Sequence, residues 1–273
     1  MSSSKVKVCV AGATGWTGQA VAKAIVQAED MELAAAVARK TAGEDIGHAL
    51  GIQKLDRKVS ASVEEAVSGD IDVFVDYTSA EAVKSNVLKA IEKGIDVVIG
   101  SSGLTASDFA EIEKAAEKAG VTVVACGNFS ITAALAKRFA LMAAEHLPHW
   151  EIIDYASDAK MDVPSGTVQE LAEELSNVRE NKLGRPIDEI RGPKEARGAQ
   201  IAGTPVHSLR LPSYKIAFES IFGLPNERLT IRHDAGAGAE PYVDGTLLAI
   251  RKIGETEGLV RGLDNLIFGK LSS

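Results

Sequence analysis

The chain has 273 residues, of which 45% are hydrophobic and 25% are charged, enough for one large domain or two modest ones with a substantial core. The formal net charge of −8 disfavours nucleic acid and anionic membrane surfaces as partners, although a local group of cations can still bind a small anion. No apolar stretch approaches the ~20 residues of a membrane-spanning helix, and the polar start lacks the apolar core of a signal peptide. We therefore expect a cytoplasmic protein that binds neither nucleic acid nor membranes.

The first half of the chain alternates short apolar runs with helical patterns. Strands are predicted at 5–11, 31–38, 71–76, 96–100 and 121–125, and helices at 15–28, 80–93 and 107–119. Strands separated by helices at this spacing predict an α/β fold with a Rossmann-type, doubly wound parallel sheet, in a dinucleotide-binding domain at 1–128. Cys9 and Cys126 lie inside apolar runs, which indicates buried thiols and no metal site.

The pattern changes after Asn128. A helix is predicted at 132–145, a strand at 151–155 and a helix at 168–175, followed by a long polar excursion at 179–203. Segments 207–211, 214–222 and 227–234 then alternate like an antiparallel sheet, with Leu224-Pro225-Asn226 as the turn between the last two. A final helix is predicted at 243–252. We expect a second, α+β domain with a mixed or antiparallel sheet at 129–240.

A glycine-rich turn joins the first predicted strand to the first helix. Residues 12–18 fit Gly-x-x-Gly-x-x-Gly, a variant of the dinucleotide fingerprint. Gly12 permits a sharp turn, Gly15 lets the backbone approach a pyrophosphate, and Gly18 lets the helix pack closely on the strand. The helix N-terminus offers free N–H groups to the phosphates. The predicted cofactor-binding residues of this turn are Gly12, Ala13, Thr14, Gly15, Trp16 and Thr17.

The end of the second strand indicates which dinucleotide binds. The sequence there is Val37-Ala38-Arg39-Lys40, with no acidic residue before Glu44 to hold the ribose hydroxyls. Arg39 and Lys40 can instead meet a 2′-phosphate, which Arg can bind bidentately. We predict that NADPH is preferred and that NADH is possible.

The later strand ends carry small, polar or aromatic residues that suit the nicotinamide half of the cofactor. Carboxyl ends of parallel strands line one crevice in an open α/β sheet, so these residues are predicted to bind the cofactor as well. They are Tyr77, Thr78, Gly100, Ser101, Ser102, Cys126, Gly127, Asn128 and Phe129.

A second motif, Lys160-Met161-Asp162-Val163-Pro164-Ser165-Gly166-Thr167, opens an amphipathic helix. Ser165, Gly166 and Thr167 bring N–H groups and hydroxyls to a helix N-terminus, and Lys160 adds a full positive charge. Together they suit a carboxylate. The residues alone fit a well-capped helix with a surface lysine equally well.

With this motif the sequence resembles the 4-hydroxy-tetrahydrodipicolinate reductase (dihydrodipicolinate reductase) family over nearly its whole length. The resemblance rests on several motifs in the right order. They are the glycine-rich turn 12–18, Asp72-Val73-Phe74-Val75-Asp76-Tyr77-Thr78, Val98-Ile99-Gly100-Ser101-Ser102-Gly103, Asn128-Phe129-Ser130, the similarity of 160–167 to Lys-x-Asp-Ala-Pro-Ser-Gly-Thr, His207-Ser208-Leu209-Arg210, and the run 222–234.

The resemblance implies an NAD(P)H-dependent oxidoreductase of lysine and diaminopimelate biosynthesis that reduces 4-hydroxy-tetrahydrodipicolinate to tetrahydrodipicolinate. It implies a substrate domain with a mixed sheet, a homotetramer built through those sheets, and a C-terminal segment, 241–273, that returns to the first domain. It also implies that Lys160 is the catalytic lysine and that a dicarboxylate or imino-acid substrate is bound near it. The expected substrate-binding residues are Ser157, Lys160, Ser165, Gly166 and Thr167.

One departure from the family limits what carries over. A His-His pair typically precedes the lysine and its first member serves in proton transfer, whereas Ala156 and Ser157 align there in this chain. Lys160 is then the best candidate proton donor, with Tyr155, Ser157 and Asp158 as second candidates. Two alternatives stay open: a reductase for a different imine or unsaturated carboxylate, and a non-catalytic NADPH-binding sensor or assembly protein.

Overall fold

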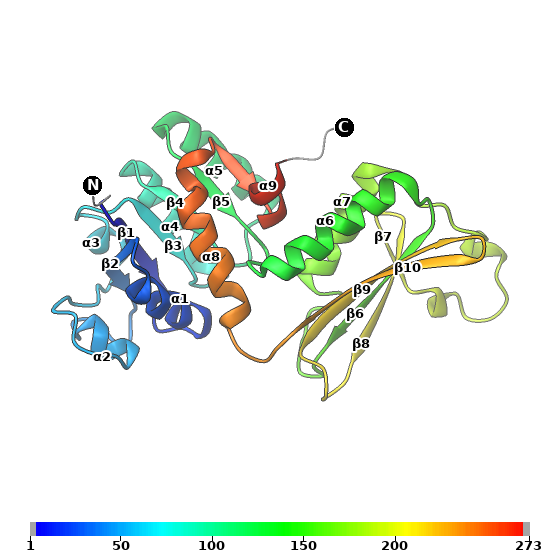
Figure 1. The fold of residues 1–273 in the computed structure, drawn as a ribbon, viewed down its shortest axis with the longest axis horizontal. Coiled ribbons are helices and arrows are strands. Elements are labelled where there is room, and N and C mark those ends of the chain that lie inside the picture. The colour runs from blue at the N-terminus through cyan, green and yellow to red at the C-terminus, as the bar shows by residue number, and fades with distance from the viewer. Residues whose placement is uncertain (1–3, 270–273) are drawn as a thin grey trace. The chain divides into compact units, whose positions relative to one another are not determined.

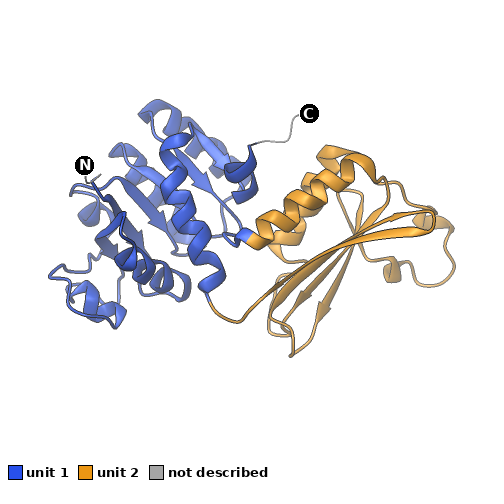
Figure 2. Cartoon of the chain, in the orientation of Figure 1, with its two compact units in different colours: residues 1–131, 239–270 blue, residues 132–238, 271–273 orange. Residues whose placement is uncertain are grey.

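The computed structural model describes residues 4–269, which form two compact units. The first unit holds the described residues of 1–131 and of 239–270, and the second holds residues 132–238 (Figure 2). No helix among residues 4–269 is long and apolar enough to cross a membrane. Each unit has its own sheet and its own core.

The first unit is built on a six-stranded parallel sheet in the order β11-β5-β4-β3-β1-β2 (Figure 1). The predicted doubly wound sheet is therefore confirmed. Its elements are β1 (Val6–Ala11), α1 (Trp16–Gln27), β2 (Met31–Val37), α2 (Ile46–Leu50), α3 (Val63–Ala66), β3 (Val73–Asp76), α4 (Ala80–Glu92), β4 (Asp96–Ile99), α5 (Ala106–Ala119), β5 (Val123–Ala125), α8 (Glu240–Lys252), β11 (Leu259–Arg261) and α9 (Leu263–Phe268).

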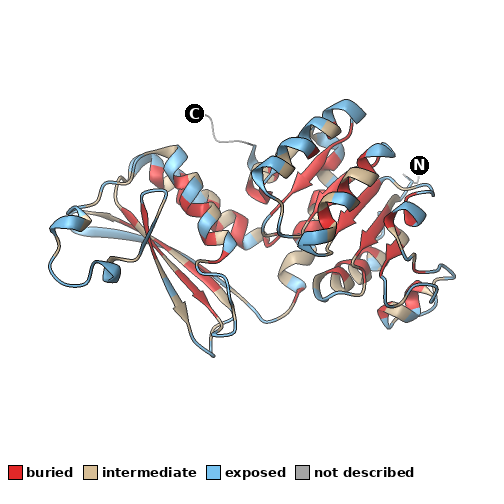
Figure 3. Ribbon diagram, turned by 180° about the vertical axis from the view of Figure 1, so that it is seen from behind, coloured by how far each residue is buried: buried red, intermediate tan, exposed pale blue. Residues whose placement is uncertain are grey.

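Helices cover both faces of this sheet, which explains why its strands are mostly apolar. Cys9 and Ala11 of β1 belong to the core on one face, together with Val87 of α4 and Ile112 of α5. Buried strand residues of this unit, coloured red in Figure 3, form a continuous band. The buried sheet holds the strand ends in place, and the loops that follow those ends carry the predicted cofactor residues.

The second unit contains a five-stranded sheet in the order β10-β9-β6-β8-β7. The sheet is mixed, as predicted from the sequence. Its elements are α6 (Ile131–His146), β6 (Trp150–Ala156), α7 (Gly166–Val178), β7 (Ala199–Ile201), β8 (Thr204–Arg210), β9 (Ile216–Leu224) and β10 (Glu227–Ala235), with short 3-10 turns at Ile187–Glu189 and Lys194–Arg197. The predicted turn at Leu224-Pro225-Asn226 is confirmed between β9 and β10, and Asn226 adopts a φ of 66° there.

Only one face of this second sheet is covered by helices among the described residues. Ile152 of β6 and Phe218 of β9 pack against Ala140 of α6 and Leu171 of α7. Alternation along β6 therefore sends Ile152, Asp154 and Ala156 toward the helices, and sends Glu151, Ile153 and Tyr155 to the other face.

Two expectations about pairing and extent need correction. Segment 207–211 is not a neighbour of 214–222 in an antiparallel sheet, because β8 pairs parallel with β6 and β6 separates it from β9. The excursion at 179–203 contains a strand, β7, and the C-terminal region adds β11 to the first sheet. Both strands have only three residues, too few for an alternating pattern to be detected.

Candidate functional site

The glycine-rich turn is shaped by contacts between backbone atoms. Gly12 has a φ of 76°, and a Cβ there would lie 2.2 Å from the carbonyl oxygen of Tyr77. A Cβ on Gly18 would lie 2.2 Å from the carbonyl oxygen of Gly12. A larger residue at position 12 would push the turn away from the loop after β3, and one at position 18 would push α1 away from the turn, so both glycines are required.

The N-terminus of α1 is left open for an anion. Gly15 is its N-cap and has no side chain to cap it, and the first turn contains no acidic residue. In contrast, α5 begins with a capping box made by Thr105 and Asp108. An uncapped helix start presents N–H groups and a positive dipole end, which fits the diphosphate of a dinucleotide.

The other predicted cofactor residues follow the carboxyl ends of five neighbouring strands. The Gly12 N–H donates to the Val37 carbonyl at 2.9 Å, so the turn lies beside the end of β2, where Arg39 and Lys40 are exposed. Among residues 4–269, neither of these two cations forms an ion pair. Tyr77 follows β3, Gly100 follows β4 and Cys126 follows β5. The strand ends thus lie along one edge of the sheet.

Asp76 organises two of these loops from the inside. Its fully buried carboxylate accepts hydrogen bonds from the Thr78 N–H (3.0 Å) and hydroxyl (2.7 Å), from Ser101 Oγ (2.6 Å) and from Asn86 Nδ2 (3.0 Å). The hydroxyls of Thr78 and Ser101 are therefore engaged within the protein.

Tyr77 is fixed by a short chain of hydrogen bonds to α8. Thr246 Oγ1 donates to the Tyr242 carbonyl at 2.7 Å, so the Tyr77 hydroxyl, 2.6 Å away, donates to Thr246. Burial raises the pKa of the Tyr77 phenol, which keeps it neutral. Its ring meets Phe129 edge to face, with centroids 6.2 Å apart. Tyr77 and Phe129, from the loops that follow β3 and β5, are thereby brought into contact.

The second motif forms the loop between β6 and α7 in the second unit. Ser157 follows β6 directly, and its hydroxyl contacts the Asp158 carboxylate (3.2 Å) and the Ala159 N–H (3.3 Å). Ser165 is the N-cap of α7 but makes no side-chain cap hydrogen bond, and the first turn of α7 has no acidic residue. A Cβ on Gly166 would meet nothing within 4 Å, so this helix start is also open to an approaching anion.

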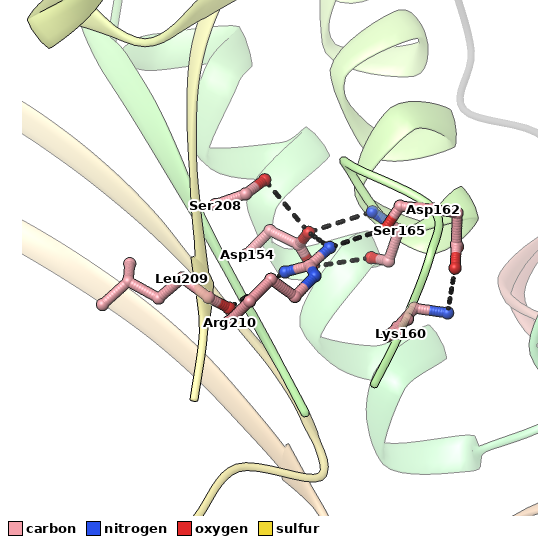
Figure 4. A network of polar contacts seen from close by, with 7 residues as sticks. All are labelled: Asp154, Lys160, Asp162, Ser165, Ser208, Leu209 and Arg210. Carbon is pink, nitrogen blue, oxygen red and sulfur yellow. Dashed lines mark hydrogen bonds and ion pairs between the residues drawn. The ribbon is translucent and has the colours of Figure 1, made fainter. Parts of the chain in front are cut away.

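A buried carboxylate holds this loop in place (Figure 4). Asp154 is fully buried, and it accepts hydrogen bonds from the N–H (2.9 Å) and hydroxyl (2.8 Å) of Ser165, from Ser208 Oγ (3.2 Å) and from Arg210 Nη2 (2.7 Å). The same Arg210 nitrogen donates to the carbonyl of Asp162 at 2.8 Å. The Ser165 hydroxyl, expected to contact substrate, thus donates to Asp154.

Lys160 is paired with an acidic residue of its own loop. Its Nζ lies 2.8 Å from Asp162 Oδ1, and its side chain is partly exposed. Burial acts to raise the pKa of the Asp162 carboxyl, but the hydrogen bond from Lys160, a backbone hydrogen bond and the charges of Lys160 and Arg210 together outweigh burial and hold this pKa below the ordinary value. The Asp162 carboxyl is therefore ionised at neutral pH.

Sequence reasoning missed Asp154, Ser208 and Arg210. Asp154 lies 54 and 56 residues from the other two in the chain, and the parallel register of β6 and β8 places it opposite Ser208. One signal was present, because Asp154 alternates with Ile152 and Ala156 on the face of β6 that the helices cover. A carboxylate on an apolar strand face needs buried partners.

The chain matches two family models that together span most of its length. Residues 6–129 match the model described as dihydrodipicolinate reductase, N-terminus, and residues 130–267 match dihydrodipicolinate reductase, C-terminus. A 4-hydroxy-tetrahydrodipicolinate reductase from Desulfitobacterium hafniense is 37% identical over 265 residues, covering 96% of this chain and 99% of that protein. One from Thermosynechococcus vestitus is 38% identical over 271 residues, covering 97% and 98%.

A solved structure is similar as well. The dipicolinate-bound dihydrodipicolinate reductase from Paenisporosarcina sp. TG-14 superposes with a TM-score of 0.81 at 30% identity, covering 96% of this chain and 99% of that one. Sequence and fold thus agree over both units.

Proposed function

The chain belongs to the dihydrodipicolinate reductase family, and from this premise we propose that it reduces 4-hydroxy-tetrahydrodipicolinate with a nicotinamide dinucleotide in lysine and diaminopimelate biosynthesis. It is an NAD(P)H-dependent oxidoreductase. The observation that carries the proposal is the match of relatives with this activity over almost the whole chain. A non-catalytic sensor or assembly protein would not need its second unit to match the family. Residues 130–267 do match, and they include Lys160 and the start of α7.

We assign dinucleotide binding to the first unit. The start of α1 would hold the diphosphate, because its N–H groups have neither a side-chain cap nor an acidic neighbour. Arg39 and Lys40 would bind a 2′-phosphate, which favours NADPH over NADH. When bound, the dinucleotide supplies a hydride to a conjugated C=N/C=C system.

We assign the substrate to the second unit. The N-terminus of α7 at Gly166 and Thr167, which has no acidic residue in its first turn, and the ammonium of Lys160 would bind a substrate carboxylate. The proton that completes the reduction must come from a donor near the reacting carbon, and Lys160 is the donor we propose.

We further propose that Ala156 and Ser157 occupy the positions of the family's histidine pair. Ala156 is fully buried at the end of β6, where it has no titratable group to offer. The Ser157 hydroxyl can hold a water molecule or relay a proton but cannot supply one at neutral pH alone. This arrangement supports Lys160 as the proton donor that we propose.

The helix-free face of the second sheet favours self-association. Ile153, Leu209 and Ile221 alternate onto this face and are only partly buried in a single copy. Covering such a face with a second copy removes apolar area from water, as in obligate assemblies. We propose a homotetramer assembled through these sheets, which the molar mass from light scattering would test.

Loss of NADPH absorbance on addition of 4-hydroxy-tetrahydrodipicolinate tests the activity. We expect saturable oxidation of NADPH, with a lower KM for NADPH than for NADH. Tight NADPH binding without oxidation would contradict the proposal and favour a non-catalytic role. Oxidation of NADPH with another cyclic imine, but not with 4-hydroxy-tetrahydrodipicolinate, would identify a reductase that acts on a different substrate.

A further inference from the structure

Two ion pairs in the loop network differ sharply in exposure. Arg210 and Asp154 are joined at 2.7 Å, with side chains 15% and 0% exposed. Lys160 and Asp162 are joined at 2.8 Å, with side chains 27% and 54% exposed. The first pair is enclosed and shares further hydrogen bonds (Figure 4). The second pair can be reached from solvent.

This difference decides which pair can exchange partners. Removing Arg210 from Asp154 would leave a buried charge without its partner, which is costly. Separating Lys160 from Asp162 costs little, because an exposed carboxylate regains water as it leaves. The enclosed pair is a fixed frame, and the open pair is the part that can change.

Asp162 is also held beside Lys160 by a hydrogen bond to its backbone carbonyl. Arg210 Nη2 donates to the Asp162 carbonyl at 2.8 Å, so the frame fixes this residue's main chain and leaves its carboxylate able to turn away. The carboxylate then competes for Lys160 at the high effective concentration of a tethered group.

We propose that Asp162 is an internal competitor for the Lys160 ammonium, and that a substrate carboxylate binds by displacing the Asp162 carboxylate from Nζ. Asp162 is then a specificity-determining residue, and Arg210 and Asp154 are positioning residues. The inference rests on the proposed function. A dicarboxylate whose second group is held elsewhere can outcompete a tethered carboxylate, whereas a dilute monocarboxylate is at a disadvantage.

Dipicolinate, the ligand of the solved relative, is a suitable dicarboxylate probe. Its Kd is measured by calorimetry on the full chain saturated with NADPH, at low ionic strength because salt screens exposed charges. Asp162→Asn and Asp162→Ala remove the competing charge but keep the carbonyl that Arg210 uses. We expect both to lower the Kd for dipicolinate about fivefold, the scale of a lost exposed ion pair.

Two controls match these variants. Asp162→Glu keeps the competing charge and is expected to bind dipicolinate within about twofold of wild type. Asp188→Asn removes the same charge from another exposed pair of the unit, Asp188 and Lys194, joined at 2.6 Å. It is likewise expected to change the Kd for dipicolinate by no more than about twofold. The Kd for NADPH is expected to stay the same in all variants.

The outcomes separate this inference from the proposed function. Equal or weaker dipicolinate binding by Asp162→Asn and Asp162→Ala, while wild type binds, would overturn the inference alone. An equal gain in Asp188→Asn would also overturn it, because a general charge effect would then explain the result. Absence of dipicolinate binding in every protein, wild type included, would overturn the proposed substrate class as well.

Discussion

The starts of α1 and α7 are alike locally but are held by different forces. Neither helix has a side-chain cap hydrogen bond or an acidic residue in its first turn, so both can receive an anion. The start of α1 is set by backbone contacts at Gly12 and Gly18. The start of α7 is set by a buried ionic network around Asp154. The first helix start thus depends on two positions without a side chain. The second depends on charged residues that are far apart in the sequence but lie on paired strands.

The largest expected effect comes from breaking the ionic network. Arg210→Met would leave the fully buried Asp154 carboxylate without its cation, and we expect a loss of about 3–5 kcal/mol in unfolding free energy. Chemical denaturation of the wild type and the variant measures this difference.

Lys194→Met is the matched control, because it breaks the pair with Asp188, whose side chains are 50% and 92% exposed. We expect it to cost less than about 1 kcal/mol. Similar losses in the two variants would mean that Asp154 does not depend on Arg210 and that the loop is held by local contacts instead.

The same contrast explains what the sequence could predict. The turn at 12–18 is contained in seven consecutive residues, so its glycine spacing sufficed, and the long elements α1, α4 and β9 were anticipated within a few residues. The Asp154 network joins residues more than 50 positions apart. It depends on β8 pairing parallel with β6, which the alternating pattern of β8 does not specify.

The next effect separates the two sites by function. Lys160→Ala is expected to lower turnover about 100-fold or more, because it removes the ammonium that we propose both binds the substrate carboxylate and donates the proton. The Kd for NADPH is expected to stay within about twofold, since Lys160 belongs to the second unit. Steady-state kinetics and calorimetry measure the two quantities.

Lys182→Ala is the control, because it removes an exposed lysine of the same unit outside the loop. Its turnover is expected to match wild type. Unchanged turnover in Lys160→Ala would remove this lysine from the mechanism, and a large loss of NADPH affinity would mean that the two sites are not separable.

The smallest expected effect tests whether the first site depends on backbone alone. Arg39→Ala combined with Lys40→Ala is expected to raise the KM for NADPH about tenfold, or about 1.4 kcal/mol, and to leave the KM for NADH unchanged. Arg251→Ala is the control, because this exposed arginine of the same unit is already paired with Asp30 at 2.7 Å. If the ratio of the two KM values stays at its wild-type level in the double variant, the start of α1 alone binds the dinucleotide. Charged side chains would then contribute to ligand binding only in the second unit, and the first unit would bind its ligand through backbone groups alone.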